Sequence, residues 1–226
     1  MTKSNSNRPA PSEAAAPARS GSPANLADLT YPAALIGASR DLADPRTKTP
    51  GSRRVLGHRN RFTRSTTPES APPRDTRPNL AGWHTFAHSI SIPAPASSLR
   101  VAIDAIVSGR MHRRAGVPLA DLSGPMSPGD VVVVRLWGLR APCLILDAPN
   151  TAQAFTLTYG TLPGHPEKGE ESFCVSHADG RLTVLVTAFS RADRPITRVG
   201  GPVARAAQRV FARRYAHAVL AEVGLG

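Results

Sequence analysis

The sequence predicts an α+β domain in which a curved antiparallel β-sheet wraps around one long C-terminal helix. Two observations predict this fold. From residue 128 onward, short alternating apolar runs follow one another with Gly, Pro, Asp or Asn between them, a pattern typical of antiparallel strands. After Pro202, apolar residues recur every three or four positions as in an amphipathic helix. A sheet with one apolar face and a helix with one apolar stripe bury both surfaces when they pack together.

The strands of this sheet can be placed from their alternation. Asp179-Gly180 lies between the last two alternating runs and predicts a tight hairpin. Further upstream, residues 82–92 fit either two short strands or a strand that enters a helix. We expect the other strands at residues 131–136, 143–146, 152–159, 171–177 and 182–189.

Two helices are expected. The first begins with Ser97 or Ser98 as its N-cap and runs to about Arg113, with an apolar face at Leu99, Ile103, Ile106 and Val107. Its basic end, at Arg110, His112, Arg113 and Arg114, suits the negative end of the helix dipole. The last helix has apolar positions at Val203, Ala207, Val210, Phe211, Tyr215, Ala218 and Val219. Its opposite face carries Arg205, Arg209, Arg213 and His217, which is either a solvated face or a surface for phosphates.

The N-terminal third has a different composition. Residues 1–25 are rich in Ser, Ala and Pro and predict a disordered tail, and residues 26–226 form a single domain. Within it, residues 43–80 read as a Pro/Arg-rich loop or linker, in which Val55–Phe62 could form a short strand. Residues 1–80 hold 13 of the 28 Lys and Arg but only 6 of the 16 Asp and Glu. This basic region could bind nucleic acid or an anionic surface, or could simply be an arginine-rich linker.

Other bulk features narrow the class of protein. Cys143 and Cys174 are too few for a disulfide framework and are expected to be buried thiols. No signal-peptide core and no run of 18 apolar residues occurs, so we expect a soluble cytoplasmic protein without a transmembrane segment. No phosphate-binding loop, dinucleotide fingerprint or nucleophile elbow is present, and no cofactor is predicted.

The most informative stretch is Tyr159-Gly-Thr-Leu-Pro-Gly-His-Pro-Glu-Lys-Gly-Glu-Glu171. Alternating runs lead into and out of it, which predicts two strands joined by a Gly- and Pro-rich loop. Because side chains repeat every second residue, Tyr159 and Glu171 should both face the core. We expect His165 to lie in the loop between them. These three are candidate catalytic residues, and a buried Glu171 would have a raised pKa.

Each candidate also has a structural interpretation. Glu171 could pair with an arginine while Tyr159 closes the core, and Arg191 is the natural counter-ion of Glu170 or Glu171. Thr161, His165 and the two carboxylates Glu167 and Glu170 could tie down backbone groups of the loop. A His-x-Glu pair without a second histidine is a poor zinc site, so no metal is predicted. The candidate ligand-binding residues are Tyr159, Thr161, His165, Glu167, Glu170, Glu171 and Arg191.

This stretch resembles the signature of the "domain of unknown function nineteen-ninety" family, which runs roughly YGTLPGHPxxGEExF. Met111–Gly116, the Ala141-Pro-Cys143 run and Ala188–Arg191 resemble further family motifs, and the resemblance covers residues 82–226 well. It implies a helix-grip fold like that of START and Bet v 1 proteins, in which Tyr31 anchors the N-terminal segment. The family's aromatic before Arg110 is replaced by Gly109 or Ser108, and its proline after Arg191 by Ala192. If that aromatic lines the interior, the cavity here is larger or differently filled.

Three functions follow as hypotheses. The first, implied by the resemblance, is binding of a small apolar ligand, such as a lipid or a secondary-metabolite intermediate, between sheet and helix. The second is an interaction protein that binds nucleic acid or an anionic surface through its basic N-terminal region. The third is a cyclase- or hydrolase-type enzyme on the same fold, which would lose turnover on Glu171→Gln.

Overall fold

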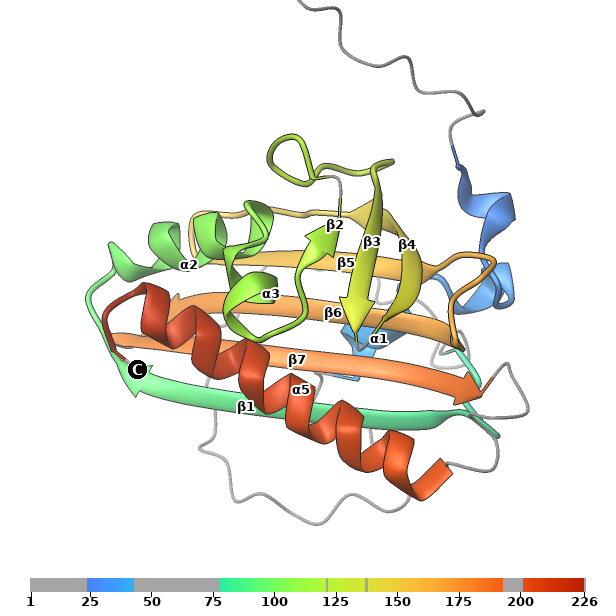
Figure 1. Cartoon of the computed structure of the whole chain (residues 1–226). Coiled ribbons are helices and arrows are strands. Elements are labelled where there is room, and N and C mark those ends of the chain that lie inside the picture. Colours follow the sequence, from blue (N-terminus) through green and yellow to red (C-terminus); the bar gives the residue numbers. More distant parts are fainter. Residues whose placement is uncertain (1–23, 43–77, 121, 137, 193–200, 226) are drawn as a thin grey trace, which may run out of the picture.

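Seven antiparallel strands form one curved sheet in the order β1-β7-β6-β5-β4-β3-β2 (Figure 1). The computed structural model describes residues 24–42, 78–120, 122–136, 138–192 and 201–225. The first strand in the sequence pairs with the last, so the two ends of the domain meet at one edge of the sheet. The strands are β1 (His84–Pro93), β2 (Leu119–Ala120), β3 (Val131–Leu136), β4 (Leu139–Asp147), β5 (Ala154–Thr161), β6 (Glu167–Ala178) and β7 (Arg181–Ala192).

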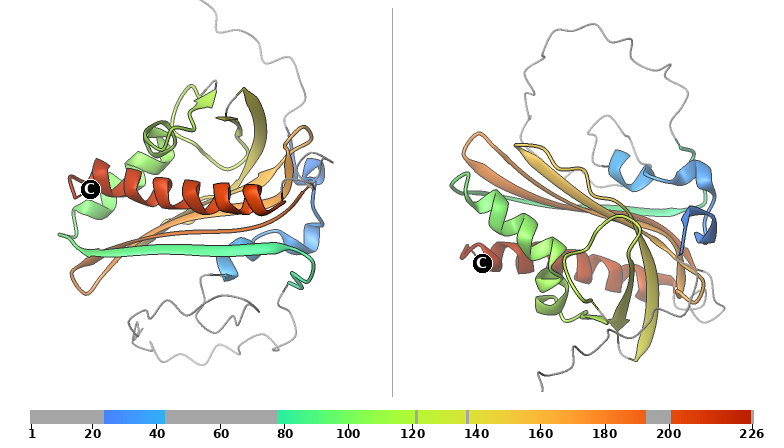
Figure 2. Two further views of the ribbon diagram at one scale, coloured as in Figure 1. Left: turned by 60° about the horizontal axis from the view of Figure 1, so that its bottom comes forward. Right: turned by 90° about the horizontal axis from the view of Figure 1, so that it is seen from above.

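Helices cover both faces of this sheet. The long helix α5 (Gly201–Glu222) crosses one face together with α2 (Ser98–Val107) and α3 (Arg110–Arg114). The N-terminal segment lies on the opposite face and contains η1 (Leu26–Asp28), η2 (Ala33–Leu35) and α1 (Ala38–Asp41) (Figure 2). Within the described part of the chain, no helix is both long enough and apolar enough to cross a membrane. The predicted fold class, a curved antiparallel sheet with a long C-terminal helix across it, is confirmed.

The main core lies between the sheet and the helices α2, α3 and α5. It contains the apolar side chains that alternate on the inner face of each strand, including Leu157, Phe173, Val175, Val184 and Val186. Leu99, Ala102 and Ile106 complete it from α2, and Ala212, Tyr215, Ala216 and Val219 from α5. One predicted core position is wrong, because Val210 is 46% exposed at the edge of the apolar stripe.

The hairpin between β6 and β7 follows the prediction. Asp179 and Gly180 both have positive φ angles, of 51° and 69°, as a two-residue hairpin turn of the primed type requires. His84–Pro93 is one continuous edge strand, so residues 82–92 form neither two short strands nor a strand that enters a helix. The first helix ends earlier than predicted. Gly109 adopts a left-handed φ of 70°, and this breaks the expected helix into α2 and α3.

The Gly- and Pro-rich loop between Tyr159 and Glu171 is shorter than its composition predicts. β6 already begins at Glu167, so Glu167, Lys168, Gly169 and Glu170 are strand residues, paired with β7. The physical reason is Gly169, whose φ of 148° is open only to glycine. A Cβ atom there would lie 2.0 Å from the carbonyl oxygen of Phe189. Glycine therefore lets β6 approach β7 closely and extends the strand toward the turn.

The N-terminal segment forms a second, smaller core on the outer face of the sheet. Tyr31, Leu35 and Ala38 pack there against Phe189 of β7. The rings of Tyr31 and Phe189 meet edge to face at 5.4 Å between centroids. Tyr31 thus anchors the segment as the resemblance implies. The predicted tail at 1–25 lies almost entirely outside the described residues, and the possible strand at 55–62 lies wholly outside them.

We predict that Gly169→Ala destabilises the domain far more than Gly180→Ala. Both glycines have positive φ, but a Cβ at Gly180 would meet nothing within 4 Å, whereas one at Gly169 overlaps backbone. The turn variant should cost about 1 kcal/mol, the penalty for a left-handed alanine. The strand variant should cost at least ~3 kcal/mol, because the overlap adds to that penalty. Urea denaturation of both variants measures the difference, and equal losses would contradict the close approach of β6 and β7.

Candidate functional site

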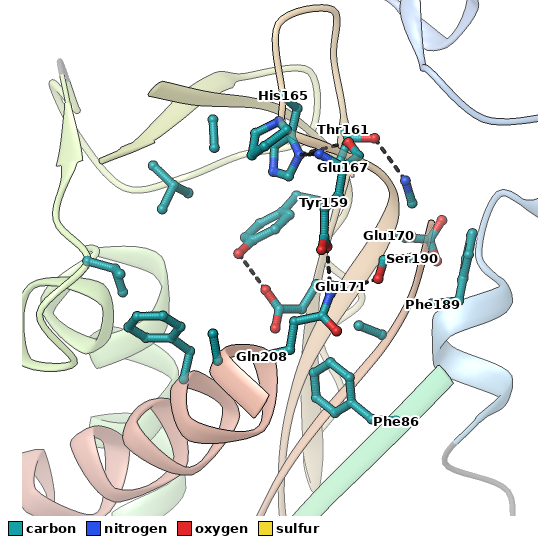
Figure 3. Close-up of a pocket in the computed structure, with 18 of the residues that line it drawn as sticks. Phe86, Tyr159, Thr161, His165, Glu167, Glu170, Glu171, Phe189, Ser190 and Gln208 are labelled. Carbon is teal, nitrogen blue, oxygen red and sulfur yellow. Dashed lines mark hydrogen bonds between the residues drawn. The ribbon is translucent and has the colours of Figure 1, made fainter. Parts of the chain in front are cut away.

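Tyr159 and Glu171 face each other across two neighbouring strands. They are directly paired in the register of β5 and β6, and the Tyr159 hydroxyl donates a hydrogen bond of 2.7 Å to Glu171 Oε2. Both side chains point toward α5, as period-two alternation predicts (Figure 3). The structure therefore brings together the two residues that the sequence placed on one face. No described arginine forms an ion pair with Glu171, so Tyr159 takes the place of the expected arginine.

Burial changes the acid–base behaviour of this pair. The loss of solvent raises the pKa of Glu171 to about 7; the hydrogen bond from Tyr159 works against the rise, and nearby Glu167 adds to it. Burial likewise raises the pKa of Tyr159 well above its ordinary value. At neutral pH the phenol is protonated, and Glu171 exchanges readily between acid and carboxylate. A carboxyl group of this kind can donate or accept a proton near physiological pH.

The pair lines a pocket of about 280 Å³ between the sheet and the first half of α5. Most of the pocket wall is apolar. Figure 3 shows Tyr159 and Glu171 pointing into it from the sheet, with Phe86 on the β1 side and Gln208 on α5. The apolar wall is formed by Phe86, Val117, Val134, Leu139, Ala141, Pro166, Ala188, Ala207 and Phe211. Polar groups enter from Tyr159, Thr161, His165, Glu167, Glu171, Ser190, Gln208 and Tyr215.

A second polar cluster connects α5 to the sheet at the pocket. Gln208 Nε2 lies 2.5 Å from Glu167 Oε2 and 2.7 Å from Ser190 Oγ, and donates to both. Burial raises the pKa of Glu167, although these two neighbours lower it in part. The other amide atom, Gln208 Oε1, is buried and has no hydrogen-bond partner among the described residues. Sequence reasoning missed Gln208 and Ser190. One sequence feature could have indicated Gln208: it lies four residues before Ala212 and therefore on the apolar side of the helix.

His165 and Thr161 hold the turn that leads into β6. The Nδ1 atom of His165 lies 3.0 Å from the backbone nitrogen of Glu167 and 2.8 Å from its carbonyl oxygen. The Thr161 hydroxyl accepts a hydrogen bond of 3.0 Å from the backbone N–H of Gly169 and is 2.6 Å from the Thr30 hydroxyl. The predicted role in satisfying backbone groups is thus seen for both residues, and both also line the pocket.

Glu170 belongs to the opposite face of the sheet. Its carboxylate is 3% exposed and points toward the N-terminal segment, away from Glu171 (Figure 3). The Tyr31 hydroxyl, the backbone N–H groups of Gly37 and Ser39, and the Ser39 hydroxyl all donate to it, over 2.5 to 3.0 Å. Ser39 is also 2.6 Å from the hydroxyl of Ser172. With four donors, this carboxylate is fully committed to holding the N-terminal segment on the sheet.

Arg191 is not the counter-ion of either glutamate. Its side chain is exposed, and its guanidinium carbon lies 4.9 Å from the centroid of the Trp83 ring. This is a cation–π contact on the outer rim of the sheet. The register of β6 and β7 explains this position, because Arg191 pairs with Lys168, two or more residues along β6 from both glutamates. The predicted role of Arg191 beside Glu170 or Glu171 is therefore wrong.

His112 is a polar residue of the core that the sequence placed at a helix end. It is fully buried among the rings of Tyr159, Phe173 and Tyr215, with centroids 5.2 to 6.2 Å away. Neither ring nitrogen has a hydrogen-bond partner among the described residues, and burial lowers the pKa of His112 to about 3. The imidazole is therefore neutral, and the expected interaction of a charged His112 with the helix dipole is wrong.

Gly109 and Ser108, the two positions at which the resemblance implies an aromatic residue, are not among the residues that line the pocket. A Cβ atom at Gly109 would meet the side chains of Leu122 at 2.9 Å and Leu119 at 3.3 Å. Those two leucines fill this region, and Gly109 does not line the pocket. Across the described residues, no three His, Cys, Asp or Glu side chains lie in an arrangement that could hold a metal ion.

Comparison with known proteins places the chain in a family. A family model for a domain of unknown function, DUF1990, matches residues 66–218. A UPF0548 protein of Deinococcus radiodurans is 34% identical over 124 residues. That match takes in 47% of this chain and 61% of the relative, so the chain spans about three fifths of the relative's length.

Two solved structures share part of the layout. Hypothetical protein jhp0584 from Helicobacter pylori is 7% identical, with a TM-score of 0.49 over 61% of this chain and 86% of that one. A norcoclaurine synthase point mutant from Thalictrum flavum, in complex with a transition-state analogue, is 11% identical, with a TM-score of 0.43 over 61% and 94%. Both TM-scores lie below 0.5, so the fold description rests on the strand order and helix placement of this chain itself.

The family match extends over more than half of the chain and includes the whole Tyr159–Glu171 hairpin. The chain therefore belongs to the DUF1990 family, a domain of unknown function.

Proposed function

We propose that this domain binds a small, largely apolar molecule in the pocket between the sheet and α5. One observation carries the proposal: a largely apolar pocket of about 280 Å³ that contains a hydrogen-bonded phenol–carboxyl pair, Tyr159 and Glu171. Ligand sites in proteins are concave, mostly apolar and provided with a few placed polar groups. A cavity of roughly 150 Å³ holds benzene, so this one suits a molecule of about ten to twelve non-hydrogen atoms.

Acid–base chemistry on the bound molecule is a second candidate function. It is favoured by Glu171, whose carboxyl group lies inside the pocket with a pKa of about 7. Such a group takes and returns protons efficiently at neutral pH. Tyr159 would orient it through the hydrogen bond of 2.7 Å. Under this hypothesis Glu171→Gln abolishes turnover while the protein remains folded.

Binding of nucleic acid or an anionic surface is a hypothesis for the basic N-terminal region. The region extends over residues 1–80, most of which lie outside the described part of the chain. Deletion of residues 1–23, before the segment that packs on the sheet, should abolish salt-dependent binding to nucleic acid if that tail carries it.

A bulky side chain in the pocket should abolish ligand binding. Ala207 lines the pocket from α5, whereas its neighbour Ala206 is exposed. We expect Ala207→Phe to weaken binding at least tenfold and Ala206→Phe to leave it unchanged, because only the first ring occupies the cavity. The measurement is native mass spectrometry of the purified protein, followed by a fragment screen by ligand-observed NMR. Equal binding by the two variants would show that the ligand lies elsewhere.

The raised pKa of Glu171 predicts a pH-dependent contribution to stability. The folded protein holds this proton up to about pH 7, while the unfolded chain releases it near pH 4.5. Stability from this group is therefore complete below pH 4.5 and is lost as the pH rises to about 7. At 1.4 kcal/mol per pKa unit, the loss is roughly 3 kcal/mol.

The comparison with Glu171→Gln isolates this effect, because glutamine keeps an acceptor for the Tyr159 hydroxyl but does not titrate. His112 has a lowered pKa and changes stability in the opposite direction, in both proteins alike. We therefore expect the difference in unfolding free energy, wild type minus variant, to fall between pH 4.5 and 7.5 in urea titrations. A difference that stays constant over this range would contradict a buried, protonated Glu171.

A further inference from the structure

We infer that the polar end of the ligand is a protonated amine, held by the carboxylate of Glu171 and the carbonyl oxygen of Gln208. This inference rests on the proposed function, since it names the chemical class that the same pocket selects. Two independent features of the pocket carry it: the sign of its charged groups, and the kind of hydrogen-bonding atom that it leaves available.

The charged groups that line the pocket are acidic. Glu171 and Glu167 enter it from β6, and no lysine or arginine is among its described lining residues. His165 also lines it, with Nδ1 engaged by the backbone of Glu167. A carboxylate or phosphate ligand would bring a further negative charge beside two carboxyl groups, which costs free energy in a site with little water. A cation instead supplies the counter-charge that Glu171 lacks.

Two hydrogen-bond donors of the pocket are already in use. The Tyr159 hydroxyl donates to Glu171, and the Gln208 amide nitrogen donates to Glu167 and Ser190. A buried acceptor remains available. Gln208 Oε1 is buried and has no partner within the described chain, and the hydrogen bond from Tyr159 occupies only one oxygen of Glu171. An unpaired buried acceptor is costly, so the pocket favours a ligand that donates hydrogen bonds.

These two features distinguish an amine from other polar groups. A ketone or ester offers only acceptors and would leave Gln208 Oε1 unpaired. An alcohol donates one hydrogen bond but leaves the charge of Glu171 uncompensated. An ammonium group donates up to three hydrogen bonds and carries the opposite charge, and a buried cation is stable only where it is both paired and hydrogen-bonded. Glu171 and Gln208 provide both conditions, from β6 and α5, and both line the same pocket (Figure 3).

The test compares three ligands of one size that differ only in the polar end. 3-Phenylpropylamine, 3-phenylpropanol and 3-phenylpropanoic acid each have ten or eleven non-hydrogen atoms, counted from their formulae, which is about the size estimated for the pocket. Isothermal titration calorimetry of the full chain at pH 7.5 should give an amine affinity at least tenfold above that of the alcohol. The acid should bind most weakly.

Two variants locate the effect. Glu171→Gln removes the charge and keeps the size, so the preference for the amine over the alcohol should fall to within about threefold. Asp179→Asn removes one negative charge at the exposed β6–β7 turn, far from the pocket, and should leave the preference intact. Alcohol binding to Glu171→Gln also shows that this variant is folded.

The possible results separate this inference from the proposed function. If the alcohol or the acid binds wild type as tightly as the amine, the inference fails, and the pocket is still a ligand site. If the amine preference survives Glu171→Gln, the charge that selects it is not Glu171, and the inference also fails. If none of the three ligands binds in calorimetry, and the fragment screen by ligand-observed NMR also finds no ligand, the proposed function itself is overturned.

Discussion

Two consecutive glutamates on β6, one buried and one half-buried, organise this domain, because a strand must send them to opposite faces of the sheet. Glu170 faces outward and receives four hydrogen bonds from the N-terminal segment. Glu171 faces inward and receives one, from Tyr159. A buried carboxylate is stable only when its charge is compensated or neutralised. The outer glutamate is compensated by donors and holds the N-terminal segment on the sheet, whereas the inner one has a pKa raised to about 7 and remains available for chemistry.

The contacts between α5 and the sheet explain why the pocket forms where it does. Gly169 permits the close approach of β6 to β7, and Glu167, two residues before it, contacts Gln208 of α5. Gln208 then bridges Glu167 and Ser190 and fixes the helix above the sheet at a point where small side chains such as Ala188 and Ala207 leave space. Farther along α5, larger side chains including Val219 and Leu220 fill the same interface and pack as ordinary core. The cavity is thus confined to one end of the helix.

Sequence periodicity predicted most of the fold, and part of the site. The alternation through Phe155, Leu157 and Tyr159 correctly predicted which side chains face the core, since this depends only on the geometry of a strand. Periodicity did not predict the helix break at Gly109 or the extension of β6 through Gly169, because each depends on the backbone of a single glycine. It also placed His112 at a charged helix end, whereas this side chain is buried in the core. Arg191, the expected counter-ion of Glu170 or Glu171, instead pairs with Lys168 in the strand register and lies over the ring of Trp83.

By itself, the sequence determined the family, the order of the strands along the chain and the shared face of Tyr159 and Glu171, because all three depend on local patterns and motifs. Tertiary structure alone decided which partners these groups have. Tyr31 and Ser39 reach Glu170 across more than 130 residues of chain, and Gln208 reaches Glu167 across 41. Burial, and with it the raised pKa of Glu171, also follows from packing between distant elements, which no local pattern specifies.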